Sequence, residues 1–363
     1  HLDMMVNHQV RRTFVQRSMI LRALRGFLER EGFIEVETPM LAREACGAAA
    51  RPFVTHHNEL KSDMFLRVAP ELYLKRLIVG GLDRVFEIGK CFRNEGIDTT
   101  HNPEFTTVEI YQAYADYQDM ISLCERLLKA VCLEVHGSTV VDVLTFGSVE
   151  RQEPVKIDFG KSFKRYDFIG TLQQECGAQL PPPHKLEEPQ SLATLKGLLT
   201  KAKVDHKGLK TAAQLLDKLS SVYIEPLCVQ PSFITDYPLC MSPLAKQHRN
   251  IPGLSERFEL FVLGKELANA YSELNDPREQ RARFEHQIKM KTMGDDEAQD
   301  VDLSYCEALE YGMPPTAGYG LGIDRLCMLL LDQPSIREVQ FFPTLRPQVT
   351  TLDEAVEQLV KKG

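Results

Sequence analysis

Residues 84–114 read RVFEIGKCFRNEGIDTTHNPEFTTVEIYQAY, and the rest of the chain can be interpreted outward from them. Residues 84–93 and 104–111 are rich in β-branched and aromatic side chains, whereas the segment between them carries the turn formers Gly96, Asp98, Asn102 and Pro103. This pattern predicts two antiparallel strands joined by a loop of about ten residues. A hairpin needs only about two to five loop residues, so we expect the longer loop to have a function.

Strand periodicity indicates what this hairpin binds. Alternate residues of a strand share a face, so Phe105, Glu109 and Tyr111 are expected on one face, and Arg93 and Glu95 on one face if the first strand extends that far. Such a surface suits an anionic, planar ligand, with Arg93 binding a phosphate or carboxylate and Phe105 stacking on a base. The alternative is a solvated hairpin with one buried aromatic side chain.

A second hairpin is predicted from residues 257–263 and 266–274 around a Gly264-Lys265 turn. Asn269, Tyr271 and Glu273 alternate onto one face, and Glu259 joins that face in one of the possible strand registers. Glu266 is out of phase with them, so it reaches the same site only through a β-bulge or a twist of the edge. Two carboxylates there suggest ligands for Mg²⁺, which prefers few carboxylates together with phosphates and waters, although solvent exposure is the ordinary alternative.

Residues 318–325, GYGLGIDR, predict a glycine-rich strand that runs into a helix. The run is neither a Walker A loop nor a Rossmann fingerprint. Its glycines would let a flat ligand lie on the strand. Arg325 near the helix start would add its charge to the positive end of the helix dipole.

The remaining elements follow from periodicity and from helix and turn signals. An amphipathic helix is expected over 7–30, ended by Gly32, and a short strand over 33–36. A small-residue loop over 46–53, a strand over 65–69 and a helix from Pro70-Glu71 to about Leu77 should follow. Further helices are expected over 119–131, 192–199 and 211–223, a strand pair within 147–159, a strand over 232–236 and a short helix at the C-terminus.

Composition narrows the function class. No apolar run approaches 18 residues, so we expect no membrane span. Nine scattered cysteines without a Cys-x-x-Cys pair predict free thiols in a reducing compartment, the cytoplasm, and argue against a zinc site or disulfide framework. The net charge of −8 does not point to nucleic-acid binding over the whole surface, so any RNA contact should be local.

The motifs together resemble those of a known family. Phe92-Arg-Asn-Glu95, His101-Asn-Pro-Glu-Phe105 and Glu109-Ile-Tyr111 are similar to motif 2 of class II aminoacyl-tRNA synthetases, in the form found in lysyl-tRNA synthetases of subclass IIb. Residues of about 316–345, closed by Phe341-Phe342-Pro343 and Arg346-Pro347, resemble motif 3, and residues of about 7–40 resemble motif 1. Motif 1 forms the family's homodimer interface, although the helix alone would equally allow ordinary core packing.

The resemblance implies an α+β fold, in which helices flank the antiparallel β-sheet of the class II catalytic domain, over residues 1–363. An insertion of about 138–225 is expected to be mostly helical. The family also carries an anticodon-binding β-barrel before motif 1. Six residues before Asn7 cannot supply one, so we expect the printed sequence to lack it.

The implied reaction activates L-lysine with ATP to lysyl-adenylate and transfers the lysyl group to lysine tRNA. By resemblance, Arg93 and Arg325 are the catalytic residues, and Mg²⁺ is held by Glu259 and Glu266. ATP would be bound by Arg93, Glu95, His101, Asn102, Phe105, Glu259, Gly322 and Arg325. Within that set Phe105 and Arg325 would sandwich the adenine. Lysine would be bound by Gly47, Ala48, Glu71, Arg93, Glu109, Tyr111, Asn269, Tyr271, Glu273 and Gly318.

Two other functions remain open on the sequence. A core-only paralogue that lysylates elongation factor P would share the activation step. A non-catalytic binding or signalling protein could use the same fold, but it could dispense with Arg93, Arg325 and the paired acids, which are all present.

Overall fold

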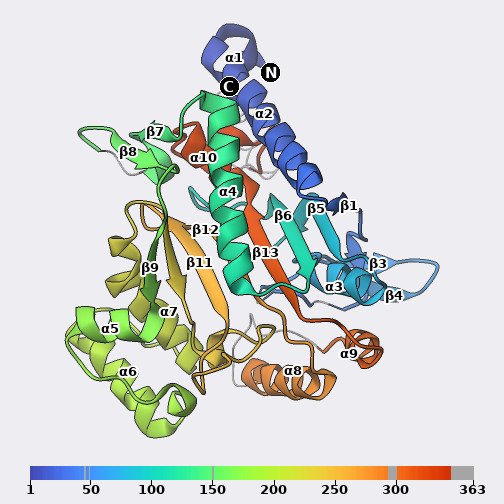
Figure 1. The fold of residues 1–363 in the computed structure, drawn as a ribbon, viewed down its shortest axis with the longest axis vertical. Coiled ribbons are helices and arrows are strands. Elements are labelled where there is room, and N and C mark those ends of the chain that lie inside the picture. The colour runs from blue at the N-terminus through green and yellow to red at the C-terminus, as the bar shows by residue number, and fades with distance from the viewer. Residues whose placement is uncertain (45, 49, 149–150, 293–300, 345–363) are drawn as a thin grey trace, which may run out of the picture.

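An eight-stranded sheet forms the centre of the computed structural model, which describes residues 1–44, 46–48, 50–148, 151–292 and 301–344 (Figure 1). The strand order is β1-β5-β6-β13-β12-β11-β10-β9. In that order the strands are Ile34–Glu35, Arg84–Phe92, Glu104–Ala113, Thr316–Gly322, Lys265–Ser272, Arg257–Val262, Ser232–Thr235 and Lys164–Asp167. The two outermost pairs, β1–β5 and β9–β10, are parallel and all others are antiparallel. The α+β class is confirmed, with a sheet that is mixed at its edges.

Three helices cover one face of this sheet: α2 (His8–Arg30), α4 (Tyr117–His136) and α10 (Ile323–Leu330). The period of two along each strand separates this core from the opposite face. On β6, Val108 and Ile110 are fully buried against the helices. Glu109 and Tyr111 alternate with them and face away from that core, so the opposite face is the polar one.

Local signals in the sequence account for the helix ends. Asn7 caps α2 by accepting a hydrogen bond from Gln9 N, and the chain leaves the helix through Gly32 with φ at +81°. A capping box between Asp116 and Asp119 begins α4, and Gly137 ends it in the left-handed conformation.

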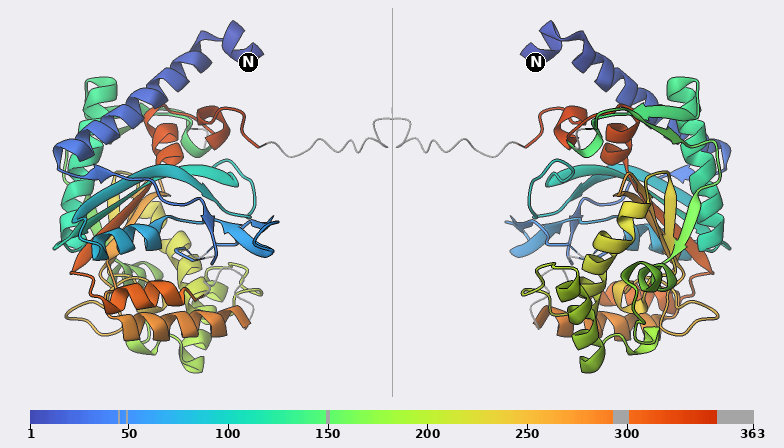
Figure 2. Two further views of the ribbon diagram at one scale, coloured as in Figure 1. Left: turned by 90° about the vertical axis from the view of Figure 1, so that its right-hand side faces the viewer. Right: turned by 90° about the vertical axis from the view of Figure 1, so that its left-hand side faces the viewer.

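Smaller elements surround the main sheet. The other helices are α1 (Leu2–Val6), α3 (Glu71–Val79), α5 (Phe168–Cys176), α6 (Pro189–Lys201), α7 (Ala212–Tyr223), α8 (Pro277–Thr292) and α9 (Leu303–Glu310). A three-stranded sheet is formed by β2 (Leu41–Ala42), β4 (Ser62–Leu66) and β3 (Val54–His57), and a two-stranded one by β7 (Val140–Val143) and β8 (Val155–Asp158). Figure 2 shows α2 extending from one end of the molecule, with α8 and α9 at the other.

Several predicted boundaries were wrong. The strand pair expected within 147–159 is formed by β7 and β8, so its first strand begins earlier, at Val140. The expected strand over 65–69 lies over 62–66, and the segment 138–225 is less helical than expected because it contributes β9 to the main sheet. The β11–β12 turn is centred on Leu263 and Gly264, which both have positive φ, one residue before the predicted position.

Two further expectations concern the C-terminal segment and membrane-spanning helices. Arg346-Pro347 and the C-terminal helix lie outside the described residues. Within the described ranges, no helix is both long and apolar enough to cross a membrane.

Candidate active site

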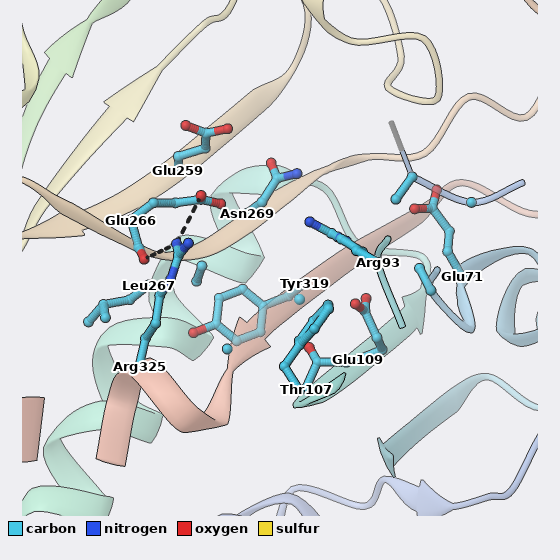
Figure 3. Close-up of a pocket in the computed structure, with 18 of the residues that line it drawn as sticks. Glu71, Arg93, Thr107, Glu109, Glu259, Glu266, Leu267, Asn269, Tyr319 and Arg325 are labelled. Carbon is cyan, nitrogen blue, oxygen red and sulfur yellow. Dashed lines mark hydrogen bonds and ion pairs between the residues drawn. The ribbon is translucent and has the colours of Figure 1, made fainter. Parts of the chain in front are cut away.

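A cavity of about 580 Å³ lies on the polar face of the sheet (Figure 3). Its lining contains every predicted site residue except Glu273: Gly47, Ala48, Glu71, Arg93, Glu95, His101, Asn102, Phe105, Glu109, Tyr111, Glu259, Glu266, Asn269, Tyr271, Gly318, Gly322 and Arg325. Residues that are far apart in the sequence therefore share one site. In Figure 3, Glu71, Arg93 and Glu109 lie toward one end, and Glu259, Glu266 and Arg325 toward the other.

The glycines of β13 make room for the floor of this cavity. A Cβ atom on Gly320 would lie 2.9 Å from Glu109 Oε1. One on Gly318 would overlap the Glu273 carboxylate and press on the Tyr111 ring. The glycine-rich strand thus allows carboxylates of the neighbouring strands to pack across it.

A β-bulge brings Glu266 into the site. Glu259 of β11 pairs directly with Asn269 of β12, but the register shifts after Leu260, which pairs with Ala268, so that Phe261 pairs with Glu266. The shift changes the phase of the strand, and both carboxylates line the cavity. The bulge expected from the sequence is confirmed.

The long β5–β6 loop positions Arg93. Its backbone N–H donates to Pro103 O at 2.8 Å, and its guanidinium carbon lies 5.1 Å from the centroid of the Phe105 ring. Across the described residues, the buried atoms Arg93 Nε and Asn102 Oδ1 have no hydrogen-bond partner. These two atoms are available to a ligand, because buried polar atoms are normally paired.

A chain of polar contacts fixes Arg325. Arg325 donates to Glu266 O at 2.8 Å, forms an ion pair with Glu266 Oε2 at 3.3 Å and approaches His101 Nε2 at 2.9 Å. A guanidinium can only donate, so Nε2 is the acceptor and the proton of the His101 ring lies on Nδ1, which donates to Asp98 at 2.8 Å. Although burial opposes the shift, hydrogen bonds from Thr100 N–H and His101 hold the pKa of Asp98 at about 2.

Arg93 lies beside the Phe105 ring, and Arg325 is held by Glu266 and His101. The expected adenine sandwich between Phe105 and Arg325 stays a prediction.

Negative charge from neighbouring carboxylates outweighs the positive charge close to Glu259. Tyr237 OH donates to it at 2.6 Å and Arg257 Nη2 at 2.5 Å. Burial, with Glu266 and Asp217, nevertheless raises the pKa of Glu259 to about 7, while Arg257 opposes the rise. A cation between Glu259 and Glu266 would relieve this repulsion. Two carboxylates in a cavity of this size fit Mg²⁺ bound together with phosphates, which supply its remaining ligands.

The other end of the cavity is acidic. Tyr271 OH lies 2.7 Å from both carboxylate oxygens of Glu71. Burial, followed by repulsion from Glu71, raises the pKa of Glu109 to about 8, although Arg93 opposes the rise. Cationic groups of a ligand would therefore be attracted to this end.

Glu273 lies behind the wall of that acidic end. It is 1% exposed, and its carboxylate forms an ion pair with Lys75. Glu273 is not among the residues that line the cavity, and its predicted role at the side-chain ammonium of lysine stays a prediction.

The sequence and its relatives identify the family. The family model described as tRNA synthetases class II (D, K and N) matches residues 1–346. The chain belongs to the class II tRNA synthetases. It is 50% identical over 363 residues, 100% of this chain and 60% of the relative, to a lysine–tRNA ligase, cla4, of Cladosporium cladosporioides.

Two further relatives agree with this assignment. A probable cytoplasmic lysine–tRNA ligase of Vairimorpha ceranae is 48% identical over 96% of this chain and 68% of its own length. A lysine–tRNA ligase of Roseiflexus castenholzii is 50% identical over the same shares. The chain therefore spans 60 to 68% of the length of these three curated relatives.

Sequence reasoning missed several residues of this class II synthetase site. Arg257 shares a strand face with Glu259, two residues away, so periodicity could have found it; its Nε donates to Asn269 at 3.0 Å. Asp217 lines the cavity from α7, a segment in which no motif pointed to it. Lys75, four residues after Glu71 on α3, could have been found from helical spacing.

Proposed function

We propose that this chain is the catalytic part of a lysine–tRNA ligase. It would activate L-lysine with ATP and transfer the lysyl group to the 3′ end of lysine tRNA. One observation carries the proposal: a single cavity joins an acidic end, at Glu71 and Glu109 with Arg93 beside them, to an end where Arg325 lies beside Glu259 and Glu266. The three relatives named above are lysine–tRNA ligases or probable ones, which supports the same activity.

The acidic end supports lysine as the amino acid. Glu71 would accept hydrogen bonds from the α-ammonium, and Glu273 and Tyr111 would take the side-chain ammonium. A buried carboxylate left without a cation is costly, so a neutral or acidic side chain would be rejected. Aspartate would bring another carboxylate to an end of the cavity that is lined by Glu71 and Glu109 and has Glu273 behind its wall.

The arginines support activation at phosphorus. In the first step a lysine carboxylate oxygen attacks the α-phosphorus of ATP, the bond from that phosphorus to the bridging oxygen breaks, and pyrophosphate leaves. Arg93 would contact the carboxylate and the α-phosphate, and Arg325 with His101 would contact the departing phosphates. Such steps depend on positioning and charge neutralisation more than on a protein nucleophile.

The adenine would lie against Phe105. Asn102 Oδ1, buried and without a partner among the described residues, would accept a hydrogen bond from the edge of the base, with Glu95 beside it. Gly322 leaves the end of β13 open to the nucleotide. Mg²⁺, when bound, would supply positive charge beside the phosphates, and Glu259 and Glu266 are the residues that would hold it.

In the second step the terminal ribose hydroxyl of lysine tRNA attacks the acyl carbon, and AMP leaves. We further propose that the protein acts in the cytoplasm as a homodimer through α2 and β1. Both strand residues of β1 are exposed, and Ile34 is 52% exposed, which supports a partner on that edge.

The test is lysine transfer to a defined acceptor. The protein is incubated with labelled lysine, ATP and Mg²⁺, together with lysine tRNA or with elongation factor P. The proposal predicts label on the tRNA. Label on elongation factor P alone would identify the core-only paralogue, and binding of lysine and ATP without label on either acceptor would support a non-catalytic protein.

A further inference from the structure

We infer that Lys75 is a specificity-determining positioning residue, which holds one oxygen of Glu273 so that the other is presented, charged, to the side-chain ammonium of the substrate. The inference rests on the proposed function. It goes beyond it because Lys75 does not line the cavity and would act only through its two carboxylate partners.

The contacts of Lys75 fix the geometry. Its ammonium is fully buried and lies 2.5 Å from Glu71 Oε1, and it also forms an ion pair with Glu273 Oε2. The ring centroids of Tyr271 and Tyr305 lie 5.6 and 5.9 Å from it. Lys75 therefore links two carboxylates. Glu71 is expected at the α-ammonium of the substrate lysine, and Glu273 is expected at its side-chain ammonium.

The second oxygen of Glu273 faces the cavity wall. A Cβ atom on Gly318 would overlap Glu273 Oε1 and lie against the Tyr111 ring, and both Gly318 and Tyr111 line the cavity. Among the described residues, both oxygens of Glu273 are buried without a hydrogen-bond partner, and the ion pair with Lys75 is made by Oε2. An unpaired buried acceptor directly behind a glycine is a place for a ligand cation.

Charge explains why Lys75 is needed. Burial, with Glu71 and Glu109, raises the pKa of Glu273, and Lys75 opposes the rise. Glu273 and Glu71 outweigh burial at Lys75 and raise its pKa, so it stays an ammonium. Without that ammonium the pKa of Glu273 would rise further, which favours the protonated carboxyl, and a substrate ammonium would have to displace that proton.

The groups that face Glu273 come from four elements. They are Lys75 and Glu71 on α3, Tyr111 and Glu109 on β6, Tyr271 on β12 and Tyr305 on α9. The three tyrosines have raised pKa values and stay neutral near pH 7. Glu109 exchanges protons in every variant, so the carboxylate partners of Lys75 are reported by the difference between variants, and the Glu273→Gln background isolates Glu273.

The test compares the wild type with Lys75→Met at pH 7 by calorimetric titration of lysine in two buffers of different ionisation enthalpy. The variant should release about one more proton per lysine bound. The lysine affinity of the variant should fall about tenfold for each unit by which the pKa of Glu273 in the variant exceeds the solution pH. Its ATP affinity should stay within about twofold of the wild-type value. Arg76→Met is the matched control, because Arg76 is the next residue on α3 and pairs with Asp302 at 2.6 Å, outside the cavity.

Equal proton release, or equal weakening of lysine and ATP, would overturn the inference. If Lys75→Met does not fold, Glu273→Gln is compared with the double variant Lys75→Met, Glu273→Gln. In the single variant Lys75 repels the substrate ammonium, so the double variant should bind lysine more tightly. Weaker binding by the double variant would mean that Lys75 is only structural. A wild type that neither binds nor activates lysine would overturn the proposed function as well.

Discussion

Asp324 and Arg17 form a buried ion pair between the first long helix and the helix that carries Arg325. Arg17 Nη2 lies 2.7 Å from Asp324 Oδ1, and the side chains are 12% and 3% exposed. The other carboxylate oxygen accepts hydrogen bonds from Thr106 N at 2.8 Å and from Gln340 Nε2 at 2.7 Å. The Asp324 carboxylate thus links α2, α10 and β6, which it contacts at Thr106. The packing of α2 and the shape of the end of the cavity proposed to bind the nucleotide therefore depend on each other.

Arg17→Met should lower the free energy of unfolding by about 3–5 kcal/mol, because it leaves the Asp324 charge buried and unpaired. Urea denaturation measures this. Arg22→Met on the same helix is the control, since Arg22 is exposed and only 3.8 Å from Glu134, and it should change stability by at most about 1 kcal/mol. Adding Asp324→Asn to Arg17→Met should recover part of the loss. If the double variant lost as much free energy of unfolding as Arg17→Met and Asp324→Asn together, the charge argument would be contradicted.

Arg93→Ala should slow lysine-dependent pyrophosphate exchange by about 10²–10³-fold, because one preorganised charge contact to the transition state is lost. Circular dichroism should show an intact fold. Lys90→Ala is the matched change on the same hairpin. Lys90 lies on β5 and pairs with Glu104 at 3.2 Å, so its loss should leave exchange near normal. A folded Arg93→Ala protein with near-normal exchange would remove Arg93 from the mechanism.

Glu273→Gln should weaken lysine far more than ATP. Loss of one partner of a buried charge pair costs at least about 2 kcal/mol, or about thirtyfold in the dissociation constant for lysine. Parallel titrations of both ligands measure the difference. Equal weakening would indicate that Glu273 supports the fold or the nucleotide end instead.

Lysine should bind more tightly as pH rises from about 6.5 to 8.5. The pKa of Glu109 in the empty site is about 8, raised by burial and Glu71, so this carboxyl is protonated at the lower end of the range. A cationic ligand favours its ionised form, and binding therefore releases a proton below the pKa and none well above it. Glu109→Gln should flatten the profile. A wild-type profile that is already flat would contradict this assignment.

The strand residues of the cavity could be predicted from the sequence because periodicity fixes the face of a strand, whereas Glu71, His101 and Arg325, which lie on helices or a loop, were assigned by the family resemblance. Glu109 and Tyr111 alternate with Val108 and Ile110, so their orientation follows from the pattern alone. Glu266 required a bulge, and the register shift after Leu260 provides it.

Contacts between elements could not be predicted in this way. The Lys75–Glu273 pair depends on how α3 packs against the end of β12, and no local pattern reports that distance. Asp217 reaches the cavity from α7 because of long-range packing, and β9 is a short edge strand that pairs with β10. These features follow from the tertiary arrangement of the chain, which sequence spacing does not contain.

The central claim, that this site activates lysine, is tested most directly by amino-acid-dependent exchange of labelled pyrophosphate into ATP, with each of the twenty amino acids in turn. Exchange needs only activation, so neither tRNA nor its docking affects the result. The account predicts strong exchange with lysine, loss of it in Arg93→Ala, and little with aspartate or asparagine. Exchange that is driven by another amino acid, or no exchange with lysine by a folded protein that binds ATP, would contradict it.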